Sequence, residues 1–416
     1  MSIKKLIVSN FKSFNEMEIE LNNFNVLIGA NASGKSNFVH IFEFLRDIVN
    51  HGLTNALSMQ GGIEYLRNMN IKHSKNLIIK FISDANYGFL TRGEKIGIRV
   101  YETEYEFSLN FNERNSGFTV AKDILLLKCN FIKVTVNEKN LKEEKILGKG
   151  KIKISRVKNN LKVGLIKPEK VHISEDDIFS PLILPENMSS KTLILERPFS
   201  YFFMPKLEDI IANTSLYDFD PKLPKKATPI TGKAELEENG SNLSIILKNI
   251  TENNEKRKKL FNLVRDLLPF IKDLGVEKFA DKSLLFKLQE TYFENQFLPA
   301  SLISDGTINI TALIVALYFE KKPLTIIEEP ERNIHPYLIS KVMDMMKDVS
   351  PKKQIIVTTH SPEVVKYADI NNILLVSRDS DGFSKIIKPA NKKEIKTFLK
   401  NDIGIEELYI QNLLEE

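Results

Sequence analysis

The sequence predicts an α/β fold built from the two ends of the chain, with a mixed β-ribbon and helical segment inserted between them. Two observations support this prediction. Short apolar runs of strand length recur at both ends, "FNVLIGA" near the start and "LTIIEE", "QIIVTT" and "NILLVSR" near the end. Helical patterns separate these runs, and strands that alternate with helices indicate a mainly parallel sheet.

The first predicted segment covers residues 1–130. Three short strands are expected in "KKLIVSNF", "EMEIEL" and "FNVLIGA", and more in "LIIKFIS", "GIRVYE" and "YEFSLNF". Between them, "KSNFVHIFEFLRDIV" has the spacing of an amphipathic helix, whose apolar face would comprise Phe38, Ile41, Phe42, Leu45 and Val49.

The second predicted segment covers residues 131–297. Its first part, to Lys170, carries twelve Lys and Arg against four Glu. It is either a solvated β-ribbon or a surface for DNA or an acidic partner, and both interpretations stay open. "GKGK" (148–151) is interpreted as a hairpin turn. From 174 to 299 we expect helices and loops, with one stripe formed by Leu260, Phe261, Val264, Leu267, Leu268 and Ile271.

The third predicted segment, residues 298–416, returns to strands and helices. Its apolar run "ITALIVALYF" is about half of a bilayer span, so it indicates a buried helix and no membrane association. The single cysteine excludes an internal disulfide and a cysteine-rich zinc site, and the histidines lack metal-ligand spacing. Without a signal peptide pattern, a cytoplasmic location is expected. A net charge of +5 permits nucleic-acid binding without arguing for it.

A phosphate-binding loop is predicted at "GANASGKSN". Gly29, Gly34, Lys35 and Ser36 match the G-x-x-x-x-G-K-[ST] pattern, between an expected strand and an expected helix. Backbone N–H groups of such a loop face the phosphates, the lysine reaches the β- and γ-phosphates, and the serine hydroxyl binds Mg²⁺. We therefore expect ATP and Mg²⁺ as ligands of the loop residues Gly29, Ala30, Asn31, Ala32, Ser33, Gly34, Lys35, Ser36 and Asn37.

Three downstream elements complete the predicted site. In "LTIIEEPE" a buried strand ends in two carboxylates: Glu328 would hold Mg²⁺ and Glu329 would orient or deprotonate the attacking water. "IIVTTHS" delivers His360 to the end of a strand, where it could sense the γ-phosphate. Ser304 and Gly306 in "SDGT" precede the apolar helix, whose N-terminus could face an anion on a second molecule. The alternative is an ordinary N-cap, with Ser304 or Asp305 as the capping residue.

Taken in this order, the elements resemble the ABC-type ATPase heads of the RecF, SMC and OLD proteins. The chain more closely resembles the prokaryotic group of predicted ATPases labelled AAA family ATPase. "NFKSF", "GGIEYLRN", "YDFDP", "GSNLSIIL" and "IIEEPERNIHP" also fit that group. The resemblance implies an ABC-like P-loop head and a homodimer with ATP sandwiched between subunits. Ser304 and Gly306 would then bind the γ-phosphate across the dimer.

Some positions depart from the ABC pattern. Glu328 stands where Asp is usual, "SDGT" replaces "SGGQ", and Asn309 stands where the group often has arginine. Gln60 is only a weak candidate for the Q-loop glutamine. "DSD" (379–381) matches the D-x-D of the Toprim nuclease that follows the ATPase in OLD proteins. Here it is interpreted as a hairpin turn, because too little chain follows for such a domain.

The resemblance implies an ATP-hydrolysing dimeric switch in DNA-related processes such as antiphage defence or DNA repair. The alternative is an ATP-dependent scaffold or sensor that holds an effector or toxin without binding DNA. Candidate partners are DNA and an effector protein or nuclease encoded nearby. "SDGT" disfavours a transporter subunit, and the absence of an N-K-x-D motif disfavours a GTPase.

Overall fold

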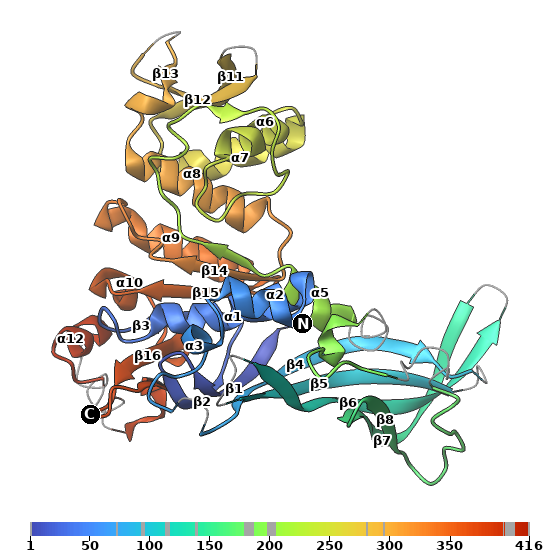
Figure 1. The fold of residues 1–416 in the computed structure, drawn as a ribbon. Helices are drawn as coiled ribbons and strands as arrows, with labels where there is room; N and C mark the ends of the chain where they lie inside the picture. Colours follow the sequence, from blue (N-terminus) through green and yellow to red (C-terminus); the bar gives the residue numbers. More distant parts are fainter. Residues whose placement is uncertain are drawn as a thin grey trace. The chain divides into compact units, whose positions relative to one another are not determined.

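The computed structural model describes residues 2–414 apart from 72–73, 93–95, 113–116, 138–139, 179–186, 198–204, 280–281, 294–295, 394 and 396–403. The chain forms two compact units, shown with the sequence colouring in Figure 1. The first comprises residues 1–22, 36–214 and 377–386, and the second comprises 23–35, 215–376 and 387–416. The units are defined by contacts between residues, and each combines several segments of the chain. They do not test the boundaries predicted at residues 130 and 297, which stay a prediction.

The first unit contains a seven-stranded antiparallel sheet in the order β2-β1-β4-β5-β6-β7-β8. Strands predicted in "KKLIVSNF", "EMEIEL" and "LIIKFIS" are confirmed in it, whereas "GIRVYE" and "YEFSLNF", predicted as two strands, form one continuous strand, and "FNVLIGA" belongs to the other unit's sheet. "GKGK" is no turn, because Gly148–Lys151 lie inside β7 and the chain reverses only after Val157. The strands are β1 (Ile3–Phe11), β2 (Phe14–Glu20), β4 (Leu77–Leu90), β5 (Ile96–Phe111), β6 (Phe118–Asn137), β7 (Asn140–Val157) and β8 (Asn160–Ile166).

Helices accompany this sheet in the first unit. The predicted amphipathic helix is α1 (Lys35–His51), and four of its five predicted apolar residues are buried, while Val49 is half-buried. The unit also contains α2 (Leu53–Met59), α3 (Ile63–Leu66), α5 (Pro205–Ala212) and the 3₁₀ turn η1 (Ile194–Glu196).

A buried carboxylate connects β6 to η1 in this unit. The Asp123 side chain accepts hydrogen bonds from the Tyr105 hydroxyl at 2.8 Å and from the Ile194 N–H at 2.7 Å. Burial raises the pKa of Asp123 to about 7, and these two hydrogen bonds act in the opposite direction. Folding therefore favours the protonated form of this side chain.

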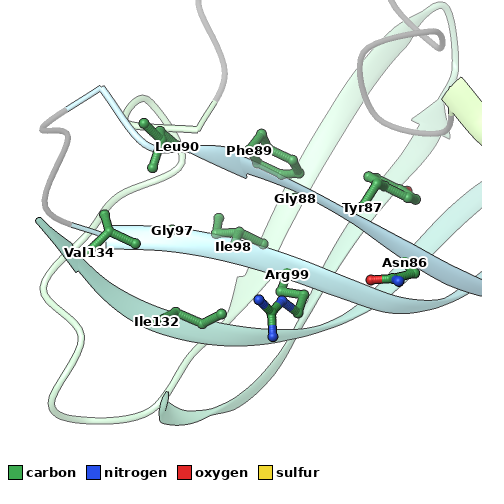
Figure 2. Close-up of a pocket in the computed structure, with 10 residues that line it drawn as sticks. All are labelled: Asn86, Tyr87, Gly88, Phe89, Leu90, Gly97, Ile98, Arg99, Ile132 and Val134. Carbon is green, nitrogen blue, oxygen red and sulfur yellow. The ribbon is translucent and has the colours of Figure 1, made fainter. Parts of the chain in front are cut away.

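A pocket of about 340 Å³ lies on the same sheet, where β4, β5 and β6 run side by side (Figure 2). Phe89, Ile98, Ile132 and Val134 supply an apolar lining. The nucleotide motifs contribute no residue to it, because every lining residue comes from these three strands.

The second unit contains the predicted parallel sheet. Phe24–Ile28 (β3) pairs in parallel with Gln354–Thr359 (β15) and Ile373–Arg378 (β16), so a strand from the start of the chain lies between strands from its end. Leu324–Glu328 (β14) pairs in parallel with β15 and with Ser215–Tyr217 (β9). The predicted α/β fold is thereby confirmed, and the carboxyl ends of these strands share one edge.

The second unit also contains helices. The apolar run predicted as a buried helix is α8 (Asp305–Tyr318), and residues 307–317 of it are all buried. The other helices are α6 (Leu243–Thr251), α7 (Asn254–Leu267), α9 (Pro336–Val349), α10 (Pro362–Lys366) and α12 (Ile405–Ile410).

A small antiparallel sheet contradicts the prediction of helices and loops for residues 174–299. Strand β12 (Ser283–Glu290) pairs with β11 (Ile271–Phe279), β10 (Thr228–Pro229) and β13 (Leu298–Pro299). The predicted helical stripe ran through Ile271, but the helix ends at Leu267, two residues before Pro269. Proline disfavours helical backbone in the residue before it, so Ile271 is free to start a strand.

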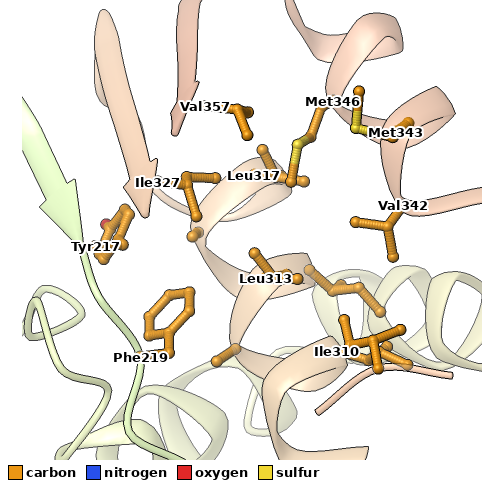
Figure 3. Packing of buried hydrophobic residues seen from close by; sticks show 14 of the residues in the cluster. Tyr217, Phe219, Ile310, Leu313, Leu317, Ile327, Val342, Met343, Met346 and Val357 are labelled. Atoms are coloured by element: carbon orange, nitrogen blue, oxygen red, sulfur yellow. The ribbon is translucent and has the colours of Figure 1, made fainter. Parts of the chain in front are cut away.

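The core of the second unit packs α8 and α9 against the parallel sheet. Leu313 and Leu317 of α8 lie among Ile327 of β14 and Val342 and Met346 of α9 (Figure 3). Among the described residues no helix is both long and apolar enough to cross a membrane.

Candidate nucleotide-binding site

The phosphate-loop motif directly follows β3 in the second unit. Gly34 has φ +118° and Ala32 has φ +62°, so the loop turns through backbone conformations that L side chains rarely adopt. A Cβ atom at Gly29 would collide with the backbone oxygen of Val376. The loop therefore needs glycine at position 29 because β16 approaches it closely.

The Lys35 side chain folds back onto this loop. Its Nζ donates hydrogen bonds to the carbonyl oxygens of Gly29 at 2.8 Å and Ala30 at 3.0 Å. Burial lowers the pKa of Lys35, while the carboxylates of Glu329, Glu328 and Glu331 act in the opposite direction. The ammonium group thus contacts the loop that would hold phosphate and lies close enough to the acidic residues at the end of β14 to interact with their charge.

The two predicted carboxylates lie where expected, at the carboxyl end of β14. Glu328 is the last residue of the strand and is paired in register with Thr358 of β15. The Glu329 N–H donates to the Thr358 carbonyl at 2.8 Å, and Glu329 has φ +45°. This conformation is uncommon for a residue with a side chain, and such residues concentrate at functional sites.

Both carboxylate oxygens of Glu329 are engaged. Oε1 lies 2.8 Å from His360 Nδ1, and Oε2 lies 3.0 Å from Arg332 Nη2. Burial by itself would raise the pKa of Glu329, but Arg332 and His360 together hold it below its ordinary value. An ionised carboxylate can accept a proton, which is the state a general base requires.

His360 follows the last residue of β15, and the pairing of β15 with β14 brings it together with Glu329. Half of its side-chain surface is exposed. Since Nδ1 faces Glu329, Nε2 remains to meet a ligand.

The sequence analysis did not single out three residues of this site, Asp218, Glu331 and Arg332. Arg332 bridges Glu329 to Asp218, whose Oδ1 lies 2.7 Å from Arg332 Nη1. The Thr359 hydroxyl donates to Glu331 Oε1 at 2.5 Å, and burial raises the pKa of Glu331. The motifs "YDFDP" and "IIEEPERNIHP" contain all three residues, but neither motif indicates that Asp218 and Arg332 meet.

Of the two candidate capping residues, Ser304 caps α8. Its Oγ accepts a hydrogen bond from the Thr307 N–H at 3.2 Å, at the N-terminus of α8. A Cβ atom at Gly306 would lie 2.5 Å from the Asn333 carbonyl oxygen. Buried Asn309 donates from Nδ2 to the Arg332 carbonyl at 2.7 Å, so the residue at the departing position contacts the loop after β14.

Ser36 and Asn37 are the second and third residues of α1 and belong to the first unit, as does Gln60. Asn37 Nδ2 donates to Ser13 Oγ at 2.7 Å, and Gln60 Nε2 donates to Glu43 Oε2 at 3.1 Å. The roles predicted for all three stay predictions.

The "DSD" stretch forms the predicted hairpin turn. Asp379 Oδ1 accepts hydrogen bonds from the N–H groups of Asp381 and Phe383, and the Asp379 N–H donates to the Phe383 carbonyl. The Asp379 carboxylate therefore stabilises the turn between β16 and β17 (Ser384–Ile387).

Several solved structures are similar over most of the chain. An SMC head bound to the C-winged helix domain of ScpA shares 17% identity, with a TM-score of 0.46, over 93% of this chain and 97% of that chain. The SMC head domain from Thermotoga maritima shares 14% identity, with a TM-score of 0.42, over 93% of this chain and 99% of that chain.

A curated relative is similar over a shorter stretch. The Septu protein PtuA of Bacillus thuringiensis is 29% identical over 102 residues, which make up 22% of this chain. The match spans about a quarter of the relative's length, 26%.

One family profile matches most of the chain, residues 24–366, and its description reads "AAA domain, putative AbiEii toxin, Type IV TA system". The matched range begins at β3 and includes the phosphate loop, the cap of α8, both carboxylates and His360. The resemblance predicted from the motifs is confirmed, and the chain belongs to this family of AAA-domain ATPases.

Proposed function

We propose that this protein hydrolyses ATP and acts as an ATP-gated dimeric switch. The observation that carries the proposal is the hydrogen bond between Glu329 and His360, 2.8 Å long, at the strand edge where Lys35 also lies. It joins a base for the attacking water to a group able to contact the transferred phosphate.

Each residue of this arrangement has a distinct role in the proposed reaction. Lys35 would leave the loop carbonyls and bind the phosphates, since a charged phosphate oxygen is a stronger acceptor than a neutral carbonyl. Glu329 would take the proton of the attacking water as the bond to the γ-phosphorus forms and the bond to the β-phosphate oxygen breaks. His360 would orient Glu329 through Nδ1 and donate to the γ-phosphate through Nε2.

Mg²⁺ fits the donors present. The ion usually takes one or two protein oxygen ligands beside phosphate oxygens and water. Ser36 would supply its hydroxyl and Glu328 its carboxylate, and the bound ion would neutralise charge on the phosphates. Among the described residues no group of three or more His, Cys, Asp or Glu side chains could hold a metal alone.

The decisive experiment uses Glu329→Gln, which keeps the size of the side chain and removes the base. We expect ATP binding to persist, turnover to fall by about 10²–10⁴-fold, and ATP to trap a homodimer with Ser304 and Gly306 facing the second subunit's nucleotide. Light scattering after size exclusion with ATP measures the dimer. A monomer at every ATP and protein concentration would refute the sandwich, and unchanged turnover would refute the role of Glu329.

DNA-related work is proposed from the charge pattern of the first unit. Lys149, Lys151 and Lys153 alternate along β7, so they share one exposed face of the sheet with a spacing of about 7 Å. In the described part of the chain none of the three forms an ion pair. Lysines on β4 and β6 of the same sheet differ: Lys80, Lys122 and Lys128 are each paired with glutamates of β5.

This difference supplies a matched control. Changing Lys149, Lys151 and Lys153 to Gln should weaken duplex DNA binding and flatten its salt dependence, because phosphate contacts release counterions. Changing Lys80, Lys122 and Lys128 to Gln removes the same formal charge from the same sheet face, and we expect a smaller effect. Equal effects would show that net charge alone drives binding.

The alternative function is a scaffold that holds an effector protein or toxin without binding DNA. The unpaired lysines also fit an acidic protein surface. Glu329→Gln protein trapped with ATP would then co-purify with a protein partner and retain no duplex DNA at low salt. An antiphage or DNA-repair role follows only if DNA is retained and the ATP-bound dimer binds it more tightly than the ATP-free protein.

A further inference from the structure

Arg332 joins two carboxylates, Glu329 three residues before it and Asp218, which lies 114 residues before it in the sequence. Arg332 Nη1 lies 2.7 Å from Asp218 Oδ1, while Nη2 and Nε lie 3.0 and 3.4 Å from Glu329 Oε2. The guanidinium group therefore donates from Nη1 to Asp218 and from Nη2 and Nε to Glu329. His360 Nδ1 contacts Oε1, the other carboxylate oxygen of Glu329, so both oxygens of this carboxylate have a partner.

The backbone around this arginine is also fixed. The Arg332 carbonyl accepts the hydrogen bond from buried Asn309, and the Arg332 N–H donates to the Glu329 carbonyl at 3.0 Å. Asn333, the next residue, has φ +62° and its carbonyl lies against Gly306. A loop held at consecutive residues presents the guanidinium in one place.

Asp218 is likewise held in place. It directly follows β9, which is paired with β14, the strand that ends at Glu328. Its N–H donates to the Glu238 carbonyl at 3.0 Å. Adjacent parallel strands therefore deliver Asp218 and Glu329 to the same edge of the sheet, and Arg332 lies between them.

We propose that Arg332 is a positioning residue for Glu329, and that Asp218 holds the guanidinium in its working orientation. The inference rests on the proposed ATP hydrolysis. Arg332 would act through Glu329: it fixes Oε2 so that the carboxylate turns a free lone pair of electrons toward the water. The Asp218 carboxylate keeps the arginine from turning away to solvent.

Arginine suits this position better than lysine. A planar guanidinium can donate to two carboxylates on different sides at fixed angles, whereas an ammonium is a point donor on a flexible stem. Arg332→Lys should therefore recover only part of the function that Arg332→Gln loses.

The test measures steady-state ATP hydrolysis by Arg332→Gln, Arg332→Lys, Asp218→Asn and the Arg332→Gln/Asp218→Asn double variant. We expect Arg332→Gln to lower kcat by about 10–100-fold, since misplacing a catalytic group by about 1 Å costs up to about 100-fold. KM for ATP should change by less than about twofold, and Arg332→Lys should fall between wild type and Arg332→Gln. The double variant should be no slower than Arg332→Gln, because both changes release the same carboxylate.

The matched control is Arg257→Gln. Arg257 Nη2 lies 3.3 Å from Asp273 Oδ2 in the same unit, and its side chain is about as exposed as that of Arg332. Among the described residues it contacts Asp273 and Phe261, which lie outside the site, so kcat should stay at the wild-type value. Thermal unfolding of each variant shows whether it folds.

Different results overturn different claims. If Arg332→Gln and Arg332→Lys lower the unfolding temperature but leave kcat unchanged, Arg332 only tethers its loop. Additive losses in the double variant, or a rise in KM at constant kcat, would also overturn the positioning role. If wild type and Glu329→Gln hydrolyse ATP equally, the proposed function fails and the inference falls with it.

Discussion

Replacing Gly306 by alanine separates the demands of local structure from those of tertiary structure. Gly306 is the second residue of α8, and its φ is not positive, so its backbone suits alanine. Helix propensity alone predicts that Gly306→Ala stabilises the protein by up to about 1 kcal/mol. The structure predicts the opposite sign, because the new methyl group meets a backbone atom rather than a flexible side chain.

The magnitude follows from one distance. The added Cβ would lie 2.5 Å from the Asn333 carbonyl oxygen, whereas real Cβ contacts are essentially never under 3.0 Å. The oxygen must therefore retreat by at least about 0.5 Å, and such overpacking costs about 1–3 kcal/mol. Set against the propensity gain, the expected net loss is about 1 kcal/mol, and the two predictions differ by about 2 kcal/mol.

Thermal unfolding without nucleotide measures this difference, because no dimer contact of Gly306 then contributes. A loss of about 1 kcal/mol corresponds to about 2–4 °C for a unit of this size. Gly275→Ala is the control, since its added Cβ would meet only the Lys287 side chain at 3.7 Å. If Gly306→Ala unfolds at or above the wild-type temperature, the close approach of Asn333 does not constrain this position.

Three further predictions concern other residues. Lys35→Ala should abolish the stabilisation by ATP, which is about 2.7 kcal/mol at a hundredfold excess over Kd; an unchanged thermal shift would remove the phosphate-loop assignment. The pKa of Asp123 is about 7 in the folded protein, against 3.8 ordinarily. Ionisation of Asp123 therefore lowers the unfolding free energy of the wild type by about 1.4 kcal/mol for each pH unit between pH 5 and 7. Asparagine cannot ionise, so the difference in unfolding free energy between Asp123→Asn and wild type should change by about 2.7 kcal/mol between pH 5 and pH 8. Urea unfolding at the two pH values measures this difference. A difference that stays constant would contradict the raised pKa of Asp123. Asn309→Ala should cost about 1–3 kcal/mol, because it leaves the Arg332 carbonyl without its donor; the unfolding temperature and kcat should fall together, and a fall in neither is the contrary result.

The parts of the fold predicted correctly have local causes. The loop after β3 needs glycines and a lysine at set spacing, and the apolar residues of α1 repeat with the helical period. Ser304 caps α8 through a hydrogen bond to a residue three positions along the chain. Such features involve neighbours in sequence, so residue type and spacing predict them.

The errors arose where local signals allow two structures. The apolar stripe of α7 continues through Leu268 to Ile271, and only the proline between them stops the helix and lets β11 begin. "GKGK" has the composition of a turn, yet all four residues pair with β6, and Lys151 also pairs with β8, which keeps the segment extended. Strand pairing over long distances overrides these weak local preferences.

The amino-acid sequence was sufficient for the chemistry of the nucleotide motifs and for the α/β class, because both follow from short patterns. It could not supply the contact between Asp218 and Arg332, since nothing in either motif specifies which strands become neighbours. The β9–β14 pairing brings Asp218 to the edge where Glu329 lies, and packing of the loop against α8 sets the direction of Arg332. The carboxylate that we propose as the base is thus encoded locally, whereas its surroundings depend on how distant segments fold together.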